Sequence, residues 1–203
     1  MPTILTHALV PLAAGIALGP SRIAKPVLVT GMVLAMLPDA DVIGFKLGID
    51  YADQFGHRGA SHAVLVAAVI AALVTMLMRQ WIMQGSQNRS SELVEERFTD
   101  KRPSTGSRLR YSGPLFVFAF LFASMASHGI LDAFTSGGLG PALLWPFSDA
   151  RYFAPVTPIR VSPIGAGFFS ARGVVVILSE ALWVCDPLAL TALAGRFWLR
   201  QKA

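Results

Sequence analysis

The four histidines of this sequence each lie close to one end of an apolar run, and three aspartates lie at similar places. His128 and Asp132 are four residues apart, so on a helix their side chains share one face and can bind one ion. Asp39 and Asp41 follow Pro38 at the end of another apolar run. Neutral imidazole and carboxylate are a ligand set that zinc, manganese and iron accept. These residue types predict a metal site, with zinc as the first choice.

The elements that must position these residues are membrane helices. The chain has 203 residues, of which 54% are hydrophobic and only 14% are charged, whereas about a quarter of the residues of a typical soluble domain are charged. The single cysteine, Cys185, excludes an intramolecular disulfide and a cysteine-based zinc ribbon. Seven of the 17 basic residues lie between Arg79 and Arg110, a cluster that membrane topology explains without a nucleic-acid partner.

Five apolar runs predict an all-α, multi-pass transmembrane helical bundle of about five helices, which forms a single domain over residues 1–203. The run from Ala60 to Met78 is long enough to cross about 30 Å of hydrocarbon. The other four runs are Ile4–Leu18, Pro26–Leu37 continuing towards Phe45, Pro114–Leu131 and Gly173–Ala194.

Two segments between these runs differ from them in composition. Residues 84–113 are rich in Ser, Arg and Glu and predict a flexible cytoplasmic loop. The segment Thr135–Phe169 is dense in Gly and Pro, and we interpret it as a re-entrant or lid-like outer segment.

The distribution of basic residues predicts the orientation of the bundle. With five spans, 12 Lys and Arg residues lie on one side of the membrane and five on the other. Basic loops remain preferentially in the cytoplasm, so the N-terminus is expected outside and the C-terminus inside. A bacterial cytoplasmic (inner) membrane is the expected location.

In this topology all the candidate ligands come from four segments and lie at the outer level of the membrane. Ionisable groups at membrane depth cost about 2.5 to 3.5 kcal/mol each on insertion scales, so several at one level favour a shared cation. The candidate metal ligands are His7, Asp39, Asp41, His57, His62, His128 and Asp132.

Each of these residues also has a structural interpretation when it is taken singly. His7 could be an interfacial or capping residue, and the aspartates after Pro38 could form only a turn. His128 and Asp132 could be a hydrogen-bonded pair between helices. Arg58 lies beside the candidate ligands, where it could hold a phosphate-type oxyanion or be a solvated bystander.

Several motifs occur in a fixed order from residue 6 to about residue 148: Thr6-His7, Pro38-Asp39-x-Asp41, His57-Arg58-Gly59-x-Ser61-His62, and Ser127-His128-x-x-x-Asp132-x-x-Thr135 followed by Gly140 and Leu144-Trp145-Pro146-Phe147. This ordered set resembles the YdjM family of predicted membrane-bound metal-dependent hydrolases, which is thought to be related to zinc-dependent phospholipase C and the S1/P1 nucleases. The family pattern often has Thr where Ser61 stands, and either residue provides a hydroxyl.

The resemblance implies specific roles for the candidate residues. Asp41, His62, His128 and Asp132 would hold a first metal, and His7 with bridging Asp132 would contribute to a second. Asp39 and His57 would be ligands or would contact ligands. The soluble relatives bind a third zinc through further residues, but no histidine follows His128 in this chain, so one or two metal ions are expected.

The predicted function is hydrolysis of an ester, in particular a phosphoester, in a lipid or lipid-linked substrate. A zinc ion lowers the pKa of water from 15.7 to about 7, Asp39 would serve as base or orient a ligand, and Arg58 would hold negative charge. Two alternatives remain: a non-enzymatic membrane protein with a structural metal, and a metal-ion transporter. Ligands near one end of the bundle disfavour transport, which needs sites near the midplane.

Overall fold

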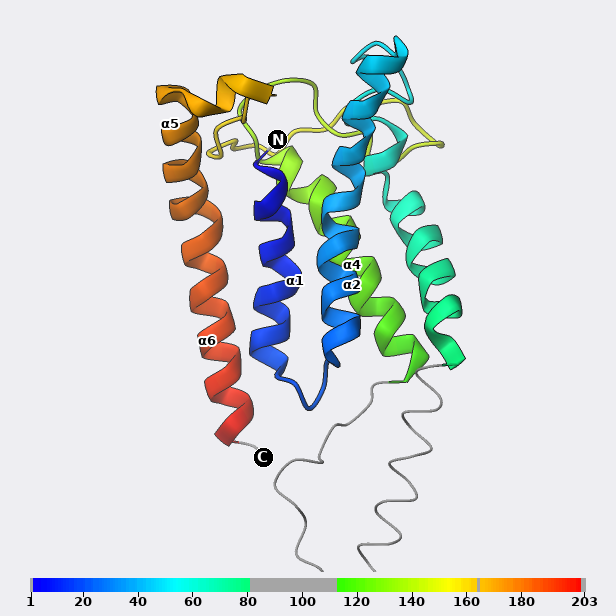
Figure 1. Ribbon diagram of the computed structural model, residues 1–203, viewed down its shortest axis with the longest axis vertical. Coiled ribbons are helices and arrows are strands. Elements are labelled where there is room, and N and C mark those ends of the chain that lie inside the picture. Colours follow the sequence, from blue (N-terminus) through cyan, green and yellow to red (C-terminus); the bar gives the residue numbers. More distant parts are fainter. Residues whose placement is uncertain (1, 81–112, 164, 202–203) are drawn as a thin grey trace, which may run out of the picture.

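The apolar runs fold as helices that lie roughly side by side in one bundle (Figure 1). The computed structural model describes residues 2–80, 113–163 and 165–201, and within these ranges it has no named strand. The helical elements are α1 (Ile4–Leu18), α2 (Lys25–Met36), the 3-10 segment η1 (Leu37–Leu47), η2 (Ala60–His62), a helix over Val64–Gln80, α4 (Pro114–Ala133), η3 (Gly165–Phe169), α5 (Ala171–Glu180), the π-turn η4 (Ala181–Cys185) and α6 (Asp186–Gln201).

Three of these helical rods are long and apolar enough to cross a membrane: Lys25–Leu47, Pro114–Ala133 and Ala171–Gln201. Two shorter apolar helices, α1 and Val64–Gln80, lie beside them. The predicted all-α membrane bundle is therefore confirmed. Large apolar side chains such as Leu182, Leu190 and Phe197 are exposed on the α5–α6 rod, where lipid would cover them.

Local sequence explains most helix ends. Pro26 and Pro114 lie in the first turns of α2 and α4, where a backbone N–H is not needed. Gly19 ends α1 with a φ of 79°, and its N–H donates to the carbonyl of Gly15. The apolar core lies between α2, the helix Val64–Gln80 and α4, and includes Val27, Ala71 and Leu121.

Two predicted boundaries differ from the structure. The third helix begins at Val64 rather than Ala60, because Ala60–His62 forms a 3-10 turn and the Val64 N–H donates to the carbonyl of Leu143. The fifth run is a continuous rod over Ala171–Gln201, in which a π-turn follows Glu180. The predicted cytoplasmic loop at 84–113 lies, apart from Gly113, outside the described residues.

The Gly/Pro-rich segment after α4 consists mainly of turns and extended chain. Its one isolated bridge joins Thr135 and Ile159. Figure 1 shows this segment at the end of the bundle where α1 begins and α4 ends, opposite the connection between α1 and α2. It thus lies at the end that carries the candidate ligands.

Candidate metal centre

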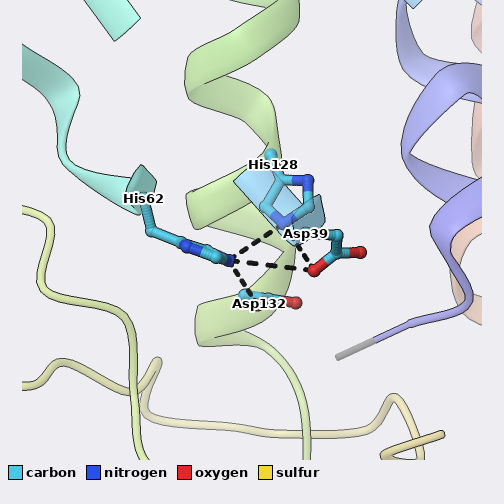
Figure 2. A group of neighbouring side chains, drawn as sticks. All are labelled: Asp39, His62, His128 and Asp132. Atoms are coloured by element: carbon cyan, nitrogen blue, oxygen red, sulfur yellow. Dashed lines mark hydrogen bonds and ion pairs between the residues drawn. The ribbon is translucent and has the colours of Figure 1, made fainter. Parts of the chain in front are cut away.

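Four buried side chains converge at this end of the bundle: Asp39, His62, His128 and Asp132. Each offers one ligand atom, and these atoms all lie within 4.8 Å of one another (Figure 2). His128 Nε2 is 3.0 Å from His62 Nε2 and 3.3 Å from Asp39 Oδ1, and His62 Nε2 is 3.3 Å from Asp132 Oδ2. A zinc ion about 2.0–2.1 Å from four tetrahedral ligands places neighbouring ligand atoms about 3.3 Å apart. The spacing therefore fits a divalent metal ion.

Each ligand is positioned by a different local structure. His128 and Asp132 lie one turn apart on α4, so they face the same way. Asp39 lies in the first turn of η1, and His62 ends η2. Gly129 allows the close approach of these segments, because a Cβ at this position would lie 2.8 Å from the carbonyl oxygen of His62.

Hydrogen bonds to the Nδ1 atoms orient both imidazoles. His128 Nδ1 donates to the carbonyl of Ala35 at 2.7 Å, and His62 Nδ1 lies 2.9 Å from Ser61 Oγ, whose hydroxyl donates to Asp41. With both Nδ1 atoms donating, the two Nε2 atoms face each other, and in the neutral rings each of them carries a lone pair. A cation between these atoms would stabilise this arrangement.

Several polar atoms of the cluster have no hydrogen-bond partner among the described residues, although buried polar atoms usually have one. These atoms are both carboxylate oxygens of Asp39 and of Asp132, both ring nitrogens of His7, and Nε of Arg58. Two of them, Arg58 Nε and Asp132 Oδ2, form an ion pair with each other at 2.9 Å. The four oxygens and His7 can all ligate a metal. The donor set present therefore fits the metal that the sequence predicts.

His7 lies beside this cluster and faces the other oxygens of the same two aspartates. Its Nε2 is 3.9 Å from Asp39 Oδ2 and 3.8 Å from Asp132 Oδ1, and its ring stacks on that of His128 with centroids 3.6 Å apart. Both carboxylates could thus bridge two metal ions, with His7 as a ligand of the second.

Asp41 and His57 lie outside the cluster, and Asp41 contacts its member His62. Asp41 Oδ1 is 2.6 Å from His57 Nδ1, and Asp41 Oδ2 is 3.3 Å from His62 Nδ1. Asp41 also accepts hydrogen bonds from the Arg58 N–H and the Ser61 hydroxyl. The structure therefore places Asp41, which the resemblance assigned to the first metal, where it orients His62.

Arg58 is fully buried, and its guanidinium group has partners within the protein. Nη1 donates to the carbonyls of Gly137 and Leu139, Nη2 donates to the Thr135 hydroxyl, and Nε lies 2.9 Å from Asp132 Oδ2. The Arg58 backbone adopts a φ of 65°, a left-handed conformation that is uncommon for a residue with a side chain. These contacts fix the position of Asp132.

The charge balance around His62 favours a cation at this position. Burial lowers the pKa of the His62 imidazole, but the carboxylates of Asp132 and Asp41 outweigh burial and raise that pKa to about 9. The two carboxylates thus attract positive charge to the point where the ligand atoms meet.

Asp39 also lines a cavity of about 690 Å³ between the start of α1, η1, η3 and α5. Asp39 is the one member of the cluster among the described residues that line this cavity.

Some contacts at the site were not predicted from the sequence. The carbonyls of Ala35, Gly137 and Leu139 carry no residue-type signal, because every residue has a carbonyl group. The hydroxyl of Thr135, which binds Arg58, belongs to a motif that the resemblance used but to which it gave no role. Arg151, which donates to the carbonyl of Arg58 at 2.6 Å, was only counted as a basic residue.

Comparisons with known proteins relate the chain to inner membrane proteins. A family model described as "YdjM inner membrane protein" matches residues 1–202. The chain is similar to "Inner membrane protein YbcI" of Escherichia coli (strain K12), with 37% identity over 203 residues that cover all of both chains. No solved structure matches the chain.

Proposed function

Because this chain belongs to the YdjM family of inner membrane proteins and holds a buried cluster of four possible metal ligands, we propose that it is a membrane-bound metal-dependent hydrolase. One observation carries the proposal: both buried carboxylate oxygens of Asp39 have no hydrogen-bond partner among the described residues, and Asp39 also lines a large cavity. A cavity that borders a ligand residue would bring a substrate close to the metal.

Asp39, His62, His128 and Asp132 would hold one divalent metal ion, with zinc favoured by the ligand set. His7, with the second oxygens of both aspartates, would hold another. A zinc ion supplies two effects when it is bound, since it lowers the pKa of water to about 7 and polarises a phosphoryl oxygen. Asp41 and Ser61 would keep the His62 ring aligned through its Nδ1 atom.

Arg58 would serve as a positioning residue. Its guanidinium nitrogens already contact two carbonyls, the Thr135 hydroxyl and Asp132, which supports a role in holding Asp132 rather than direct contact with a substrate oxyanion. Asp39 would be a ligand rather than a free base, because both of its oxygens face histidine Nε2 atoms within 4.0 Å.

The proposed substrate is a phosphoester, or another ester, of a lipid or lipid-linked molecule. The proposed site lies at the outer face of the inner membrane, which is the orientation that the 12 to 5 distribution of basic residues favours. At this level a lipid could approach laterally, and the Gly/Pro-rich segment after α4 would cover the site.

A structural metal is the second candidate, and a specific observation favours it. The ligands join α1, η1, η2 and α4, so an ion here would tie four segments together as structural zinc sites do. Such a site would be closed by protein ligands and would not need the cavity at Asp39.

Lipid hydrolysis by the purified, detergent-solubilised protein separates these candidates. The substrates are phospholipids and lipid phosphates, and activity is compared before and after removal of metal with a chelator. The hydrolase should release product only when metal is present, and Asp132→Asn should lose activity while Ser124→Ala, a buried polar change two turns away on α4, retains it. Metal-loaded protein that is inactive against the whole panel would contradict the proposal.

A further inference from the structure

The cavity at Asp39 has a lining that changes from polar to apolar. Its polar side chains include Asp39 and Glu180, which are only 2% and 4% exposed. Most of the remaining lining residues are apolar or proline, and they include Leu5, Val42 and Phe169. No lysine or arginine is among the described residues that line it. The cavity thus combines a small buried acidic region with an extended apolar wall.

The apolar wall is also the open side of the cavity. Ile4 and Leu5 at the start of α1 are 45% and 70% exposed, Phe169 in η3 is 90% exposed, and Ile177 on α5 is 52% exposed. In a bundle that crosses a membrane, exposed apolar side chains of this kind face lipid. The cavity therefore opens between α1 and α5 towards the lipid and not only towards water.

Glu180 fixes the two helices on either side of this opening. Its carboxylate accepts hydrogen bonds from the Thr3 hydroxyl at 2.8 Å and the Thr6 hydroxyl at 2.6 Å, as well as from the Thr3 backbone N–H. These bonds join the end of α5 to the start of α1. They therefore fix the spacing of α1 and α5 beside the cavity.

We propose that this cavity binds an acyl chain of a membrane lipid, which enters laterally between α1 and α5 and places the polar part of the lipid at Asp39. The inference rests on the proposed hydrolase and names its substrate as an acyl lipid. A volume of about 690 Å³ lies within the range of about 300–1,000 Å³ that is typical of ligand pockets. A water-soluble phosphoester has no acyl chain and would gain little from the apolar wall.

The test uses full-length protein in lipid nanodiscs that contain phosphatidylglycerol with a photoactivatable diazirine near the end of one acyl chain. After illumination, mass spectrometry locates the labelled peptides. Labelling should concentrate on the start of α1, η3 and the face of α5 that carries Ile177, relative to the lipid-facing residues Leu190 and Phe197 of α6.

Two variants narrow the cavity, and one serves as a matched control. Ile177→Trp and Leu5→Trp, on opposite walls, should each lower labelling of the cavity peptides about tenfold, which corresponds to about 1.4 kcal/mol of lost binding. Leu178→Trp, at the next residue of α5, which is exposed but does not line the cavity, should leave labelling unchanged. The melting temperature of each variant shows whether it is folded. If one of the two cavity variants does not fold, the other one, on the opposite wall, is compared with Leu178→Trp.

Labelling spread evenly over all lipid-facing helices, or labelling that both tryptophan variants leave intact, would overturn the inference. Cleavage of a water-soluble phosphoester without cavity labelling would overturn it too, while leaving the hydrolase in place. Cavity labelling in a protein that hydrolyses nothing would support the acyl-chain site and reject only the proposed function.

Discussion

Asp39 and Asp41 lie two residues apart, yet they contact different partners. The segment η1 is a 3-10 helix with about three residues per turn, so two such residues point in different directions. Asp39 faces the Nε2 atoms of His7, His62 and His128, whereas Asp41 binds the Nδ1 atoms of His57 and His62. In the proposed site, the Pro-Asp-x-Asp motif would thus supply one ligand and one residue that orients a ligand.

Replacing Asp39 or Asp41 should therefore lower metal affinity to different extents. Asp41→Ala should lower metal affinity about 10–100-fold, because loss of a contact behind a ligand weakens a site without removing the ligand. Asp39→Ala should lower affinity further, because it removes a ligand. Titration against a competing chelator measures both effects, and Asp50→Ala, at an exposed position in the following loop, is the control. Equal affinities for the Asp39 and Asp41 variants would show that their roles are not divided in this way.

The seven candidate residues could be found from the sequence because histidine and aspartate carry metal-binding chemistry in their side chains. The structure brings Asp39, His62, His128 and Asp132 together, with His7 next to them. The sequence could not tell which residue contacts which, because Asp41 and Arg58 are placed by bonds to distant backbone groups and side chains. Those contacts depend on how η1, η2 and the segment after α4 pack together.

The five apolar runs predicted where the helices lie. The polar residues that interrupt these runs did not predict where a helix starts or which residues they contact. His62 ends a 3-10 turn instead of starting a helix, because the chain bends there to bring its ring to α4. Glu180 was expected within the fifth span, but its partners at the start of α1 are more than 170 residues away in the sequence. Hydrophobic patterning indicates where a helix lies and not what a polar residue within it contacts.

The contact between α5 and α1 is expected to stabilise the fold. Glu180→Gln should lower the free energy of unfolding by about 1–3 kcal/mol, since it weakens three hydrogen bonds that a buried carboxylate accepts. Thermal unfolding in detergent measures the change. Asp186→Asn alters an exposed carboxylate on the same rod and should have little effect. A Glu180→Gln protein as stable as the wild type would mean that this contact does not hold the two helices together.

Over the whole molecule, the two ends of the bundle differ in chemistry. The cluster lies at the end where α1 begins, whereas the connection between α1 and α2, with Arg22 and Lys25, lies at the other end beside the C-terminal part of α6 (Figure 1). This separation matches the charge distribution from which the orientation was predicted.

Cysteine labelling tests that orientation after Cys185 is replaced by serine. Asp50→Cys, in the exposed loop after η1, should react with a membrane-impermeant reagent in intact cells, and Glu95→Cys should react only after the membrane is permeabilised. The positive-inside distribution is the physical reason. The opposite pattern of reactivity would place the cluster at the cytoplasmic face.

Elemental analysis of the purified full-length protein shows whether the four buried side chains hold a metal ion. The wild type should contain one or two equivalents of a divalent metal, with zinc expected first. In the His62→Ala/His128→Ala double variant the content should fall below about a tenth of an equivalent, while Ser124→Ala retains the wild-type content. A wild type without divalent metal, or a double variant that keeps its full complement, would show that this cluster is not a metal site.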